Sequence, residues 1–461
     1  MEIKKFTASA LALILLSACG VVESAGNSSE SRTSESTSTL SSTVSTKKVI
    51  DIVMQTVPKT DTTDTHTTTV NYITLPAADS AVRTEIVTVP ENQPVTDSEP
   101  AITQTQPVAV PVHNISSDVT NHLAEMTLHE KVCQMFITVP EAINGYDTTT
   151  YVDCAFHGGY AQYPVGGLIL FAKNIENSAQ TSALTADMQY DAMYAGTGAF
   201  IATDEEGGAI TRVQSQLGTE AVYNMNYYGE LNDWNTAFSV GETIGSYLAE
   251  YGFNLDFAPV ADVNISPYNE LGSRIFSTDP QIVADMSGAV TDGLQSQGVC
   301  STLKHFPGLG AGNNNTHYGS VWIDRTYEQL VGTEFVAFRG GINAGSDFVM
   351  VGHQITSASG DNLPGDLSHV VVTDWLRGEL GFTGIAVTDS HSMGAISNVY
   401  TSSEAAVLAI EAGIDMILMP NSLTEAVSGV EQAVQSGRIS EERINESLLR
   451  ILEKKNELGL I

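Results

Sequence analysis

Polar residues with catalytic potential lie at or shortly after the ends of short apolar runs at several places along the chain. These residues are Asp204, Asp262, Lys304-His305, His353 and Asp389. A carboxylate at the end of a buried strand can be a nucleophile, a general base, a metal ligand or a helix cap. The adjacent Lys304 and His305 offer two donors, suited to sugar hydroxyls or to a carboxylate, and a buried ion pair is the alternative. The sequence therefore predicts a polar site at strand ends.

One of these positions opens a run of carboxylates. Asp204, Glu205 and Glu206 are consecutive, a flexible Gly-Gly turn follows them, and Arg212 comes shortly after. Such a string could bind calcium, but calcium loops space their oxygen ligands alternately along the chain. The consecutive carboxylates here do not follow that spacing. A catalytic or sugar-binding role and calcium binding both stay open as alternatives.

The elements that must position these residues are visible as eight apolar runs bounded by Gly, Pro or Asp. They are 132–137, 167–171, 200–203, 254–258, 299–303, 348–351, 385–388 and 415–419. Continuous apolar runs are typical of strands buried on both faces. Amphipathic stretches of helical length lie between most of them, including 232–251, 279–297, 328–344 and 402–412, and Ser440 is the expected N-cap of a last helix over 440–455. This alternation predicts an α/β protein with a TIM (β/α)8 barrel, and a doubly wound open sheet is the alternative.

The charge composition excludes binding to nucleic acids. The 461 residues include 20 Lys and Arg against 54 Asp and Glu, which gives a formal net charge of −34. Binding to a nucleic-acid backbone depends on Lys and Arg that displace counterions, so no nucleic-acid partner is expected. The hydrophobic fraction of 42% suffices for a large core, and the excess of acidic residues favours solubility.

The first residues have the pattern of an export signal. Lys4 and Lys5 precede an apolar run over 6–16, and small residues then lead to Cys19. The run is too short to cross about 30 Å of hydrocarbon. Residues 1–19 resemble a bacterial lipoprotein signal peptide, in which Cys19 carries the lipid; an ordinary signal cut near Ala18 is the alternative. Either reading predicts export, and the first predicts anchoring to the outer face of the cell membrane.

A linker and one catalytic domain are expected after this signal. Residues 20–114 are rich in Ser and Thr and show no sustained helical or strand periodicity, which predicts a disordered tether. The domain is expected over 115–461. Cys133 and Cys300 lie in apolar runs and are expected to be buried thiols, whereas Cys154 could be free or paired.

Several strings together resemble a known family, glycoside hydrolase family 3, and within it the single-domain β-N-acetylhexosaminidase branch. They occur in order at 126–136, 164–171, 204–208 with Arg212, 254–264, 274–276, 304–308 and 380–389. Several strings in the right order are more specific than any one of them. The Glu-Gly-Gly string and the lack of a large second domain favour this branch over the two-domain β-glucosidases of the family.

The resemblance implies a retaining glycosidase. No metal or organic cofactor is expected, because the sequence has no cluster of metal ligands and no dinucleotide-binding loop. Asp389 matches the family's nucleophile, and His317 matches the acid/base histidine on the loop after the fifth strand. In this branch an aspartate two residues earlier orients that histidine, and here the position is Asn315. The positions that hold the N-acetyl sugar in the family correspond to Asp204, Arg212, Arg274, Lys304 and His305.

The chain departs from the family pattern mainly in the acid/base loop. Leu309 replaces a histidine, Ala311 an acidic residue and Asn315 the orienting aspartate, while Ser390 replaces the second aspartate of the nucleophile string. An amide can accept a hydrogen bond from imidazole, but it cannot stabilise imidazolium by charge. A comparable change in the serine-protease triad costs roughly 10⁴ in turnover.

Three hypotheses on function follow. The first is an exported exo-β-N-acetylglucosaminidase, expected to be a monomer, that acts on peptidoglycan fragments or related amino-sugar oligosaccharides. The second, motivated by Asn315, is a lipoprotein that binds amino sugars and has lost efficient acid catalysis. The third is another glycosidase, or a phosphorolytic enzyme, of the same family.

Overall fold

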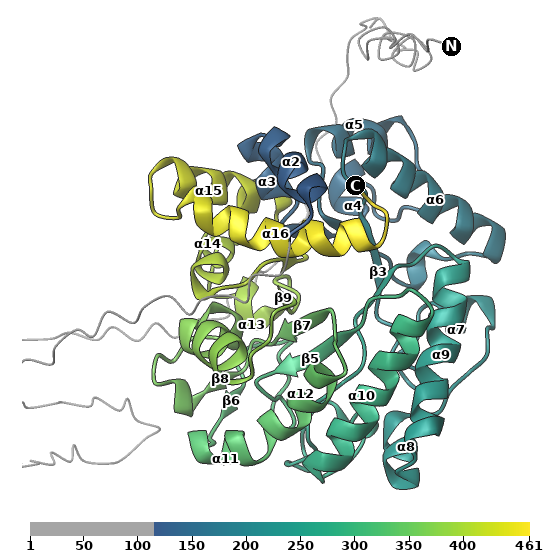
Figure 1. Cartoon of the computed structure of the whole chain (residues 1–461), viewed down its shortest axis with the longest axis vertical. Helices are drawn as coiled ribbons and strands as arrows, with labels where there is room; N and C mark the ends of the chain where they lie inside the picture. Colours follow the sequence, from purple (N-terminus) through teal and green to yellow (C-terminus); the bar gives the residue numbers. More distant parts are fainter. Residues whose placement is uncertain (1–114) are drawn as a thin grey trace, which may run out of the picture. The chain divides into compact units, whose positions relative to one another are not determined.

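The computed structural model describes residues 115–461, so the expected signal peptide, Cys19 and the linker lie outside the described residues. Within this part helices alternate with short strands (Figure 1). The strands are β1 (Phe136–Thr138), β2 (Gly167–Ile169), β3 (Phe200–Thr203), β4 (Leu255–Asp256), β5 (Thr302–Phe306), β6 (Trp322–Ile323), β7 (Phe348–Val351), β8 (Ile355–Thr356), β9 (Ile385–Thr388) and β10 (Ile417–Leu418). None of the helices over 115–461 has both the length and the apolar character needed to cross a membrane.

The strands form parallel sheets, which establishes an α/β fold. One sheet has the order β10-β1-β2-β3-β4, a second has the order β5-β7-β9, and β6 pairs with β8. Isolated parallel bridges connect the two larger sheets on both sides, at Leu255–Cys300 and Val260–Lys304 on one side and at Val387–Met416 on the other. Because the strands run in the same direction, their carboxyl ends meet at one edge.

Helices surround these strands. The longer ones are α6 (Ser178–Tyr194), α9 (Trp234–Glu250), α10 (Pro280–Ser296), α12 (Glu334–Asn343), α14 (Ser402–Ala412), α15 (Leu423–Gln435) and α16 (Glu441–Glu457). The shorter ones are α2 (Ser117–Glu125), α3 (Leu128–Cys133), α4 (Glu141–Asn144), α5 (Cys154–Gln162), α7 (Val213–Leu217), α8 (Met225–Leu231), α11 (Tyr327–Gly332) and α13 (Gly394–Ser397). A π-helix spans Val370–Glu379, and short 3-10 turns include η2 (Ala172–Asn174) and η3 (Gly272–Arg274).

Helices α9, α10 and α12 lie side by side along one flank (Figure 1). Glycines allow the close approach of α9 and α10: a Cβ atom on Gly241 would lie 2.2 Å from the carbonyl oxygen of Val290, and one on Gly293 would lie 2.2 Å from that of Phe238. The last helix, α16, packs against the first ones, α2 and α3.

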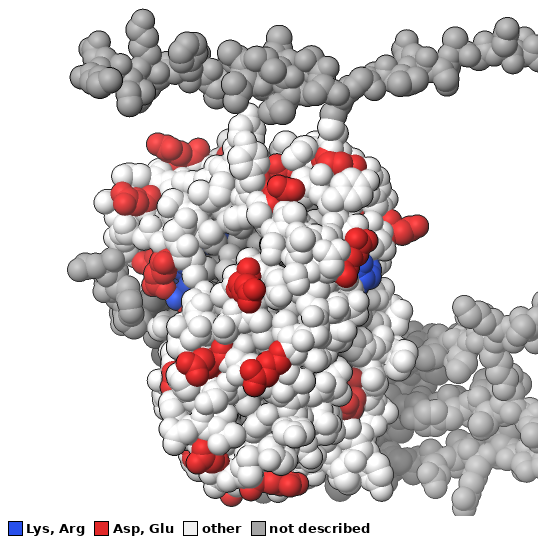
Figure 2. Space-filling view, turned by 90° about the vertical axis from the view of Figure 1, so that its right-hand side faces the viewer, with Lys and Arg blue, Asp and Glu red and all other residues white. Residues whose placement is uncertain are grey.

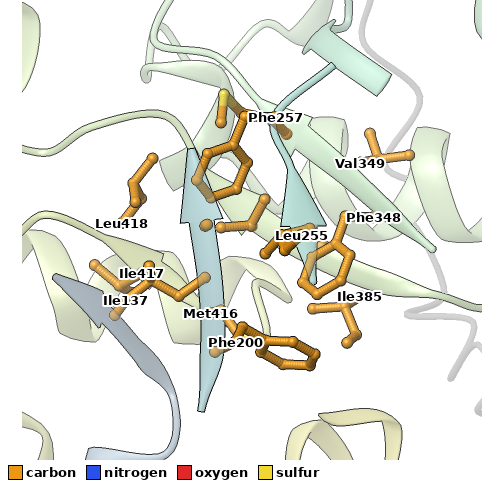
Figure 3. Packing of buried hydrophobic residues seen from close by; sticks show 14 of the residues in the cluster. Ile137, Phe200, Leu255, Phe257, Phe348, Val349, Ile385, Met416, Ile417 and Leu418 are labelled. Atoms are coloured by element: carbon orange, nitrogen blue, oxygen red, sulfur yellow. The ribbon is translucent and has the colours of Figure 1, made fainter. Parts of the chain in front are cut away.

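The apolar core lies between the two larger sheets. Phe200 on β3 and Phe348 on β7 meet edge to face, with ring centroids 5.2 Å apart, and Leu255 and Ile385 lie beside them (Figure 3). All four side chains are buried. Buried apolar area is the main stabilising contribution here, at about 25 cal/mol per Å². At the surface, acidic side chains are spread over the face in Figure 2, with few basic ones among them.

The expected elements agree with the structure in most places. The runs at 200–203, 348–351 and 385–388 are strands over those residues, and α14 covers the expected 402–412. Ser440 caps α16 by accepting a hydrogen bond from the Arg443 amide, and Cys133 and Cys300 are buried thiols as predicted.

Several elements differ from expectation; the strands expected over 254–258 and 415–419, for example, span only Leu255–Asp256 and Ile417–Leu418. The run at 132–137 begins inside α3, because Thr127 and Glu130 form a capping box that starts a helix there. The helix expected over 328–344 is interrupted at Thr333, which joins α11 to α12. The strand expected over 299–303 is shifted toward the carboxyl terminus, so that Lys304 and His305 lie within β5 rather than after it.

Candidate active site

A cavity of about 260 Å³ opens at the carboxyl ends of the strands. Seven of the residues predicted from the sequence line it: Asp204, Arg212, Arg274, Lys304, His305, His317 and Asp389. Its apolar wall includes Phe171, Met350 and Leu418. The cavity therefore combines convergent charged groups with apolar surface, as expected for a small-molecule site.

Lys304 is the centre of a buried charge cluster in this cavity. Its Nζ lies 2.6 Å from Glu206 Oε1 and 3.0 Å from Asp204 Oδ1. Arg274 binds the same Glu206 through two hydrogen bonds of 2.7 Å each. Burial alone would raise the pKa of Glu206, but Lys304 and Arg274 lower it to about 2. Sequence analysis missed Glu206 as a site residue, although its adjacency to Asp204 was a signal.

The three consecutive carboxylates have different partners. Glu205 accepts hydrogen bonds from the backbone amides of Arg212, Val213 and Gln214 and from the Tyr247 hydroxyl, so it fixes the loop after β3. Asp204 and Glu206 face the cavity instead. Among the described residues no group of His, Cys, Asp and Glu side chains is arranged to hold a metal ion. Calcium binding by this string therefore has no support in the described structure.

Arg212 has unused hydrogen-bonding capacity inside the cavity. Its guanidinium lies 5.6 Å from the centre of the Phe171 ring and 3.9 Å from Asp204. The Nε atom of Arg212 is buried and has no hydrogen-bond partner in the protein. A buried donor without a partner costs free energy, so Arg212 is well placed to bind a polar ligand group.

We expect Glu206→Gln to destabilise the protein by about 3 kcal/mol, because it leaves the buried Lys304 and Arg274 charges without their shared anion. Urea unfolding at neutral pH would measure the loss. The exposed Glu220→Gln is the matched control and should change the free energy of unfolding by less than about 0.5 kcal/mol. An unchanged stability of the Glu206 variant would contradict the prediction.

Asp389 follows β9, and its surroundings favour the ionised form of its carboxyl group. It is half-buried, and its Oδ1 accepts a hydrogen bond of 2.7 Å from the Ser390 amide. Burial would raise the pKa of Asp389, but the nearby His353 and His305 lower it below its ordinary value. The alternative role as a helix cap is excluded for α13, because Met393 is the N-cap there. An unprotonated carboxylate in a cavity is a candidate nucleophile.

Behind Asp389 lies a buried chain of two histidines and one carboxylate. Asp366 contacts His353 Nδ1 at 3.0 Å and His391 Nε2 at 2.8 Å, and His353 Nε2 lies 2.9 Å from the Ser390 carbonyl. Burial would lower the pKa of His353, but Asp366 and Asp389 raise it to about 9. His353 is therefore a cation at neutral pH and favours the anionic form of Asp389. Sequence analysis had noted His353 only as a strand-end residue.

The raised pKa of His353 predicts a pH-dependent stability. A histidine has an ordinary pKa near 6.5, so its contribution should be complete below that pH and should be lost as the pH rises through about 9. We expect the wild type to lose about 3 kcal/mol of unfolding free energy over this range relative to His353→Gln. Urea unfolding at pH 6 and pH 9.5 measures the difference. Parallel pH profiles of the two proteins would contradict the prediction.

His305 is held in one orientation by a buried carboxylate. Asp262 Oδ2 lies 2.7 Å from His305 Nδ1 and accepts a further hydrogen bond from the His305 amide, while its Oδ1 accepts from the Leu309 amide. Since Asp262 engages Nδ1, the other ring nitrogen is the one left for a ligand. Asp262 therefore acts on the site through His305 and the start of the following loop.

His317 lies on that loop, between β5 and β6, and its exposed side chain lines the cavity. Asn315 does not have the role expected for it. Its Oδ1 accepts a hydrogen bond of 2.8 Å from the backbone amide of His317 instead of contacting the imidazole. The reason is local, because an Asn side chain readily bonds to the amide two residues on. Asn315 is also absent from the lining of the cavity.

Comparison with known proteins decides the family. Residues 127–454 match the model of the glycosyl hydrolase family 3 N terminal domain. The chain belongs to this family. That match covers most of the described residues, and it includes every predicted site residue that lines the cavity.

Individual proteins are also similar to the chain. Beta-hexosaminidase A of Pseudoalteromonas piscicida is 30% identical over 325 residues, which are 65% of this chain and 54% of that protein. A beta-hexosaminidase of Nitrosomonas eutropha is 33% identical over 291 residues, 60% of this chain and 82% of the relative. The structure of a family 3 β-N-acetylglucosaminidase from a Paenibacillus species has a TM-score of 0.69 and 34% identity, over 73% of this chain and 63% of that one. The chain thus spans about half of the first relative.

Proposed function

We propose that this family 3 chain is a retaining exo-β-N-acetylhexosaminidase, which removes terminal β-linked N-acetylhexosamine. The observation that carries the proposal is the meeting of Asp389, as an anion, with His317 in one cavity beside the Lys304 charge cluster. The beta-hexosaminidases of two bacteria and the Paenibacillus β-N-acetylglucosaminidase support the choice of substrate class.

In the first step the Asp389 carboxylate attacks the anomeric carbon and the glycosidic C–O bond breaks. Protonated His317 donates its proton to the departing oxygen, so an alcohol leaves and a glycosyl-enzyme ester forms. In the second step neutral His317 takes a proton from water, which attacks the anomeric carbon and releases Asp389. Two inversions at one carbon give net retention.

The remaining cavity residues have roles in binding. Asp204 and Lys304 offer an acceptor and a donor for adjacent sugar hydroxyls, and the ring nitrogen of His305 opposite Asp262 adds another contact. The partnerless Nε of Arg212 is suited to a carbonyl oxygen such as that of the acetamido group. Arg274 acts mainly by holding Glu206.

The test is hydrolysis of β-1,4-linked N-acetylglucosamine disaccharide and of a muropeptide-derived disaccharide, with the anomer of the first product observed by NMR. We expect release of the β-anomer of N-acetylglucosamine from the non-reducing end. Faster turnover of the peptidoglycan-derived compound would support cell-wall fragments as the natural substrate. Release of the α-anomer, or of glucose alone from a β-glucoside, would overturn the assignment.

A second candidate is a protein that binds amino sugars without hydrolysing them. The hydrogen bond of Asn315 to a backbone amide favours it, because no carboxylate at this position stabilises the imidazolium. Calorimetric binding of the disaccharide without any turnover would establish this reading in place of the enzyme.

We infer in addition that the sheets close into a TIM (β/α)8 barrel. The bridges at Leu255–Cys300, Val260–Lys304 and Val387–Met416 support this closure, as does the position of the cavity at the carboxyl ends of the strands. An experimental structure with regular pairing of β4 to β5 and of β9 to β10 would test it, and an open gap at either place would contradict it.

We also propose export and lipid anchoring, with residues 1–19 as signal peptide, 20–114 as tether and 115–461 as a monomeric catalytic domain. The charged start, the apolar run and Cys19 support this organisation. Metabolic labelling with a fatty acid should mark the wild type and not Cys19→Ala. Unlabelled wild type would contradict the proposal, and a concentration-independent mass in solution would test the monomer.

A further inference from the structure

Glu270 is a carboxylate in the active-site cavity with no assigned role. It lies in the loop between β4 and η3, is half-buried and lines the same cavity as His317 and Asp389. Its Oε1 accepts hydrogen bonds from both the amide and the hydroxyl of Thr316, at 3.0 Å each. Glu270 therefore binds the residue that immediately precedes the acid/base histidine.

Thr316 is the anchor of the loop that carries His317. It is 2% exposed, whereas the neighbouring His317 and Tyr318 are exposed. Its carbonyl accepts a hydrogen bond from the Ala395 amide, and the carbonyl of His317 accepts one from the Gly394 amide. The Thr316–His317 segment is thus held between Glu270 on one side and the start of α13 on the other.

The loop that presents Glu270 is itself well fixed. Asn269 Oδ1 accepts hydrogen bonds from the Leu271 and Gly272 amides, which shapes the turn around Glu270. Nearby, the Ile265 and Ser266 amides both donate to the Gly310 carbonyl, so the loop is bound to the acid/base loop at a second place. A fixed carboxylate is what positioning an exposed catalytic side chain requires.

We propose that Glu270 is the positioning residue of the acid/base loop and supplies the negative charge that Asn315 lacks. The inference rests on the proposed glycosidase function of His317. Asn315 shapes only the backbone of His317, and among the described residues no side chain donates to or accepts from the His317 ring. Glu270 is the carboxylate that both lines the cavity and bonds to the residue next to His317.

The test compares Glu270→Gln, which removes the charge, with Glu270→Ala, which also removes the acceptor. For the N-acetylglucosamine disaccharide we expect kcat to fall about 10-fold in Glu270→Gln and up to about 100-fold in Glu270→Ala, with KM changed less than about twofold. The p-nitrophenyl glycoside needs little protonation and should lose much less. The exposed Glu328→Gln is the matched control. Equal losses on both substrates, or no loss, would overturn the proposal.

A second variant separates positioning from general damage to the fold. Asn315→Asp places a carboxylate in the loop. In the Glu270→Gln background it should therefore raise kcat by at least about threefold, which is half of the expected loss of about 10-fold on a logarithmic scale. It should have a smaller effect in the wild type. Additive effects of the two substitutions would contradict the proposal, since independent sites do not compensate one another.

A readout without turnover distinguishes failure of this inference from failure of the proposed function. The imidazole ring of His317, assigned by the absence of its signals in His317→Gln, can be followed by NMR in the free protein. Glu270→Ala should displace and broaden these ring signals, because the loop loses the acceptor that holds Thr316, whereas Glu328→Gln should leave them unchanged. If the wild type hydrolyses neither substrate but the ring signals respond, the proposed function fails while the contact of Glu270 with the loop stands. Unchanged ring signals would overturn the role of Glu270.

Discussion

Asp389→Asn should lose hydrolysis of every glycoside by about 10⁴-fold or more, since no covalent intermediate can form without the carboxylate. The amide keeps the shape of the side chain and its position after β9, so binding of N-acetylglucosamine should persist. Steady-state kinetics with the p-nitrophenyl glycoside and calorimetric binding measure the two quantities.

A rescue experiment makes the assignment of Asp389 specific. In Asp389→Ala, azide can enter the vacated space, attack the anomeric carbon and expel p-nitrophenolate, which yields the α-glycosyl azide. We expect this product only from the Asp389 variant. The exposed Asp374→Asn should retain full activity. A variant at 389 with more than about one-hundredth of wild-type activity would show that another group is the nucleophile.

The second large effect is expected at His317, and it should depend on the leaving group. His317→Gln should reduce kcat/KM for the unactivated disaccharide by about 10³-fold, because the departing alkoxide then receives no proton. The p-nitrophenyl glycoside should suffer less, since p-nitrophenolate leaves without protonation. A series of aryl glycosides whose phenol leaving groups differ in acidity measures this effect. In the variant, kcat/KM should fall more steeply as the leaving phenol becomes less acidic.

The exposed histidine at position 369 is the matched control for this variant, and His369→Gln should leave the dependence unchanged. An equal loss for all leaving groups would show that His317 contributes to binding or folding and is not the acid.

Sequence reasoning predicts the parts of this site that depend on local pattern. Asp204 and Asp389 follow continuous apolar runs that form β3 and β9, and parallel strands bring their ends together wherever the runs lie in the chain. The helix over 402–412 is likewise predicted to the residue, because Thr401 caps its start and Gly413 ends it.

Features that depend on contacts between distant loops could not be predicted in this way. In a regular strand Lys304 and His305 would point to opposite faces, yet both line the cavity, and the register of β5 against β7 shifts between Leu303 and Phe306. Glu270 belongs to no periodic element, and its partner Thr316 is 46 residues away. The different hydrogen bond of Asn315 follows from a turn that family resemblance does not specify.

The packing of α16 against α2 and α3 affects the order of folding. Lys131 pairs with Glu441, 310 residues later, and Lys455 binds Gln134 across 321 residues. The first strand, β1, likewise pairs with the last, β10. A domain whose opening elements find their partners only at its far end cannot complete its core while those residues are still being synthesised. The complete core of this domain therefore forms only once β10 and α16 are available to pair with β1 and the first helices.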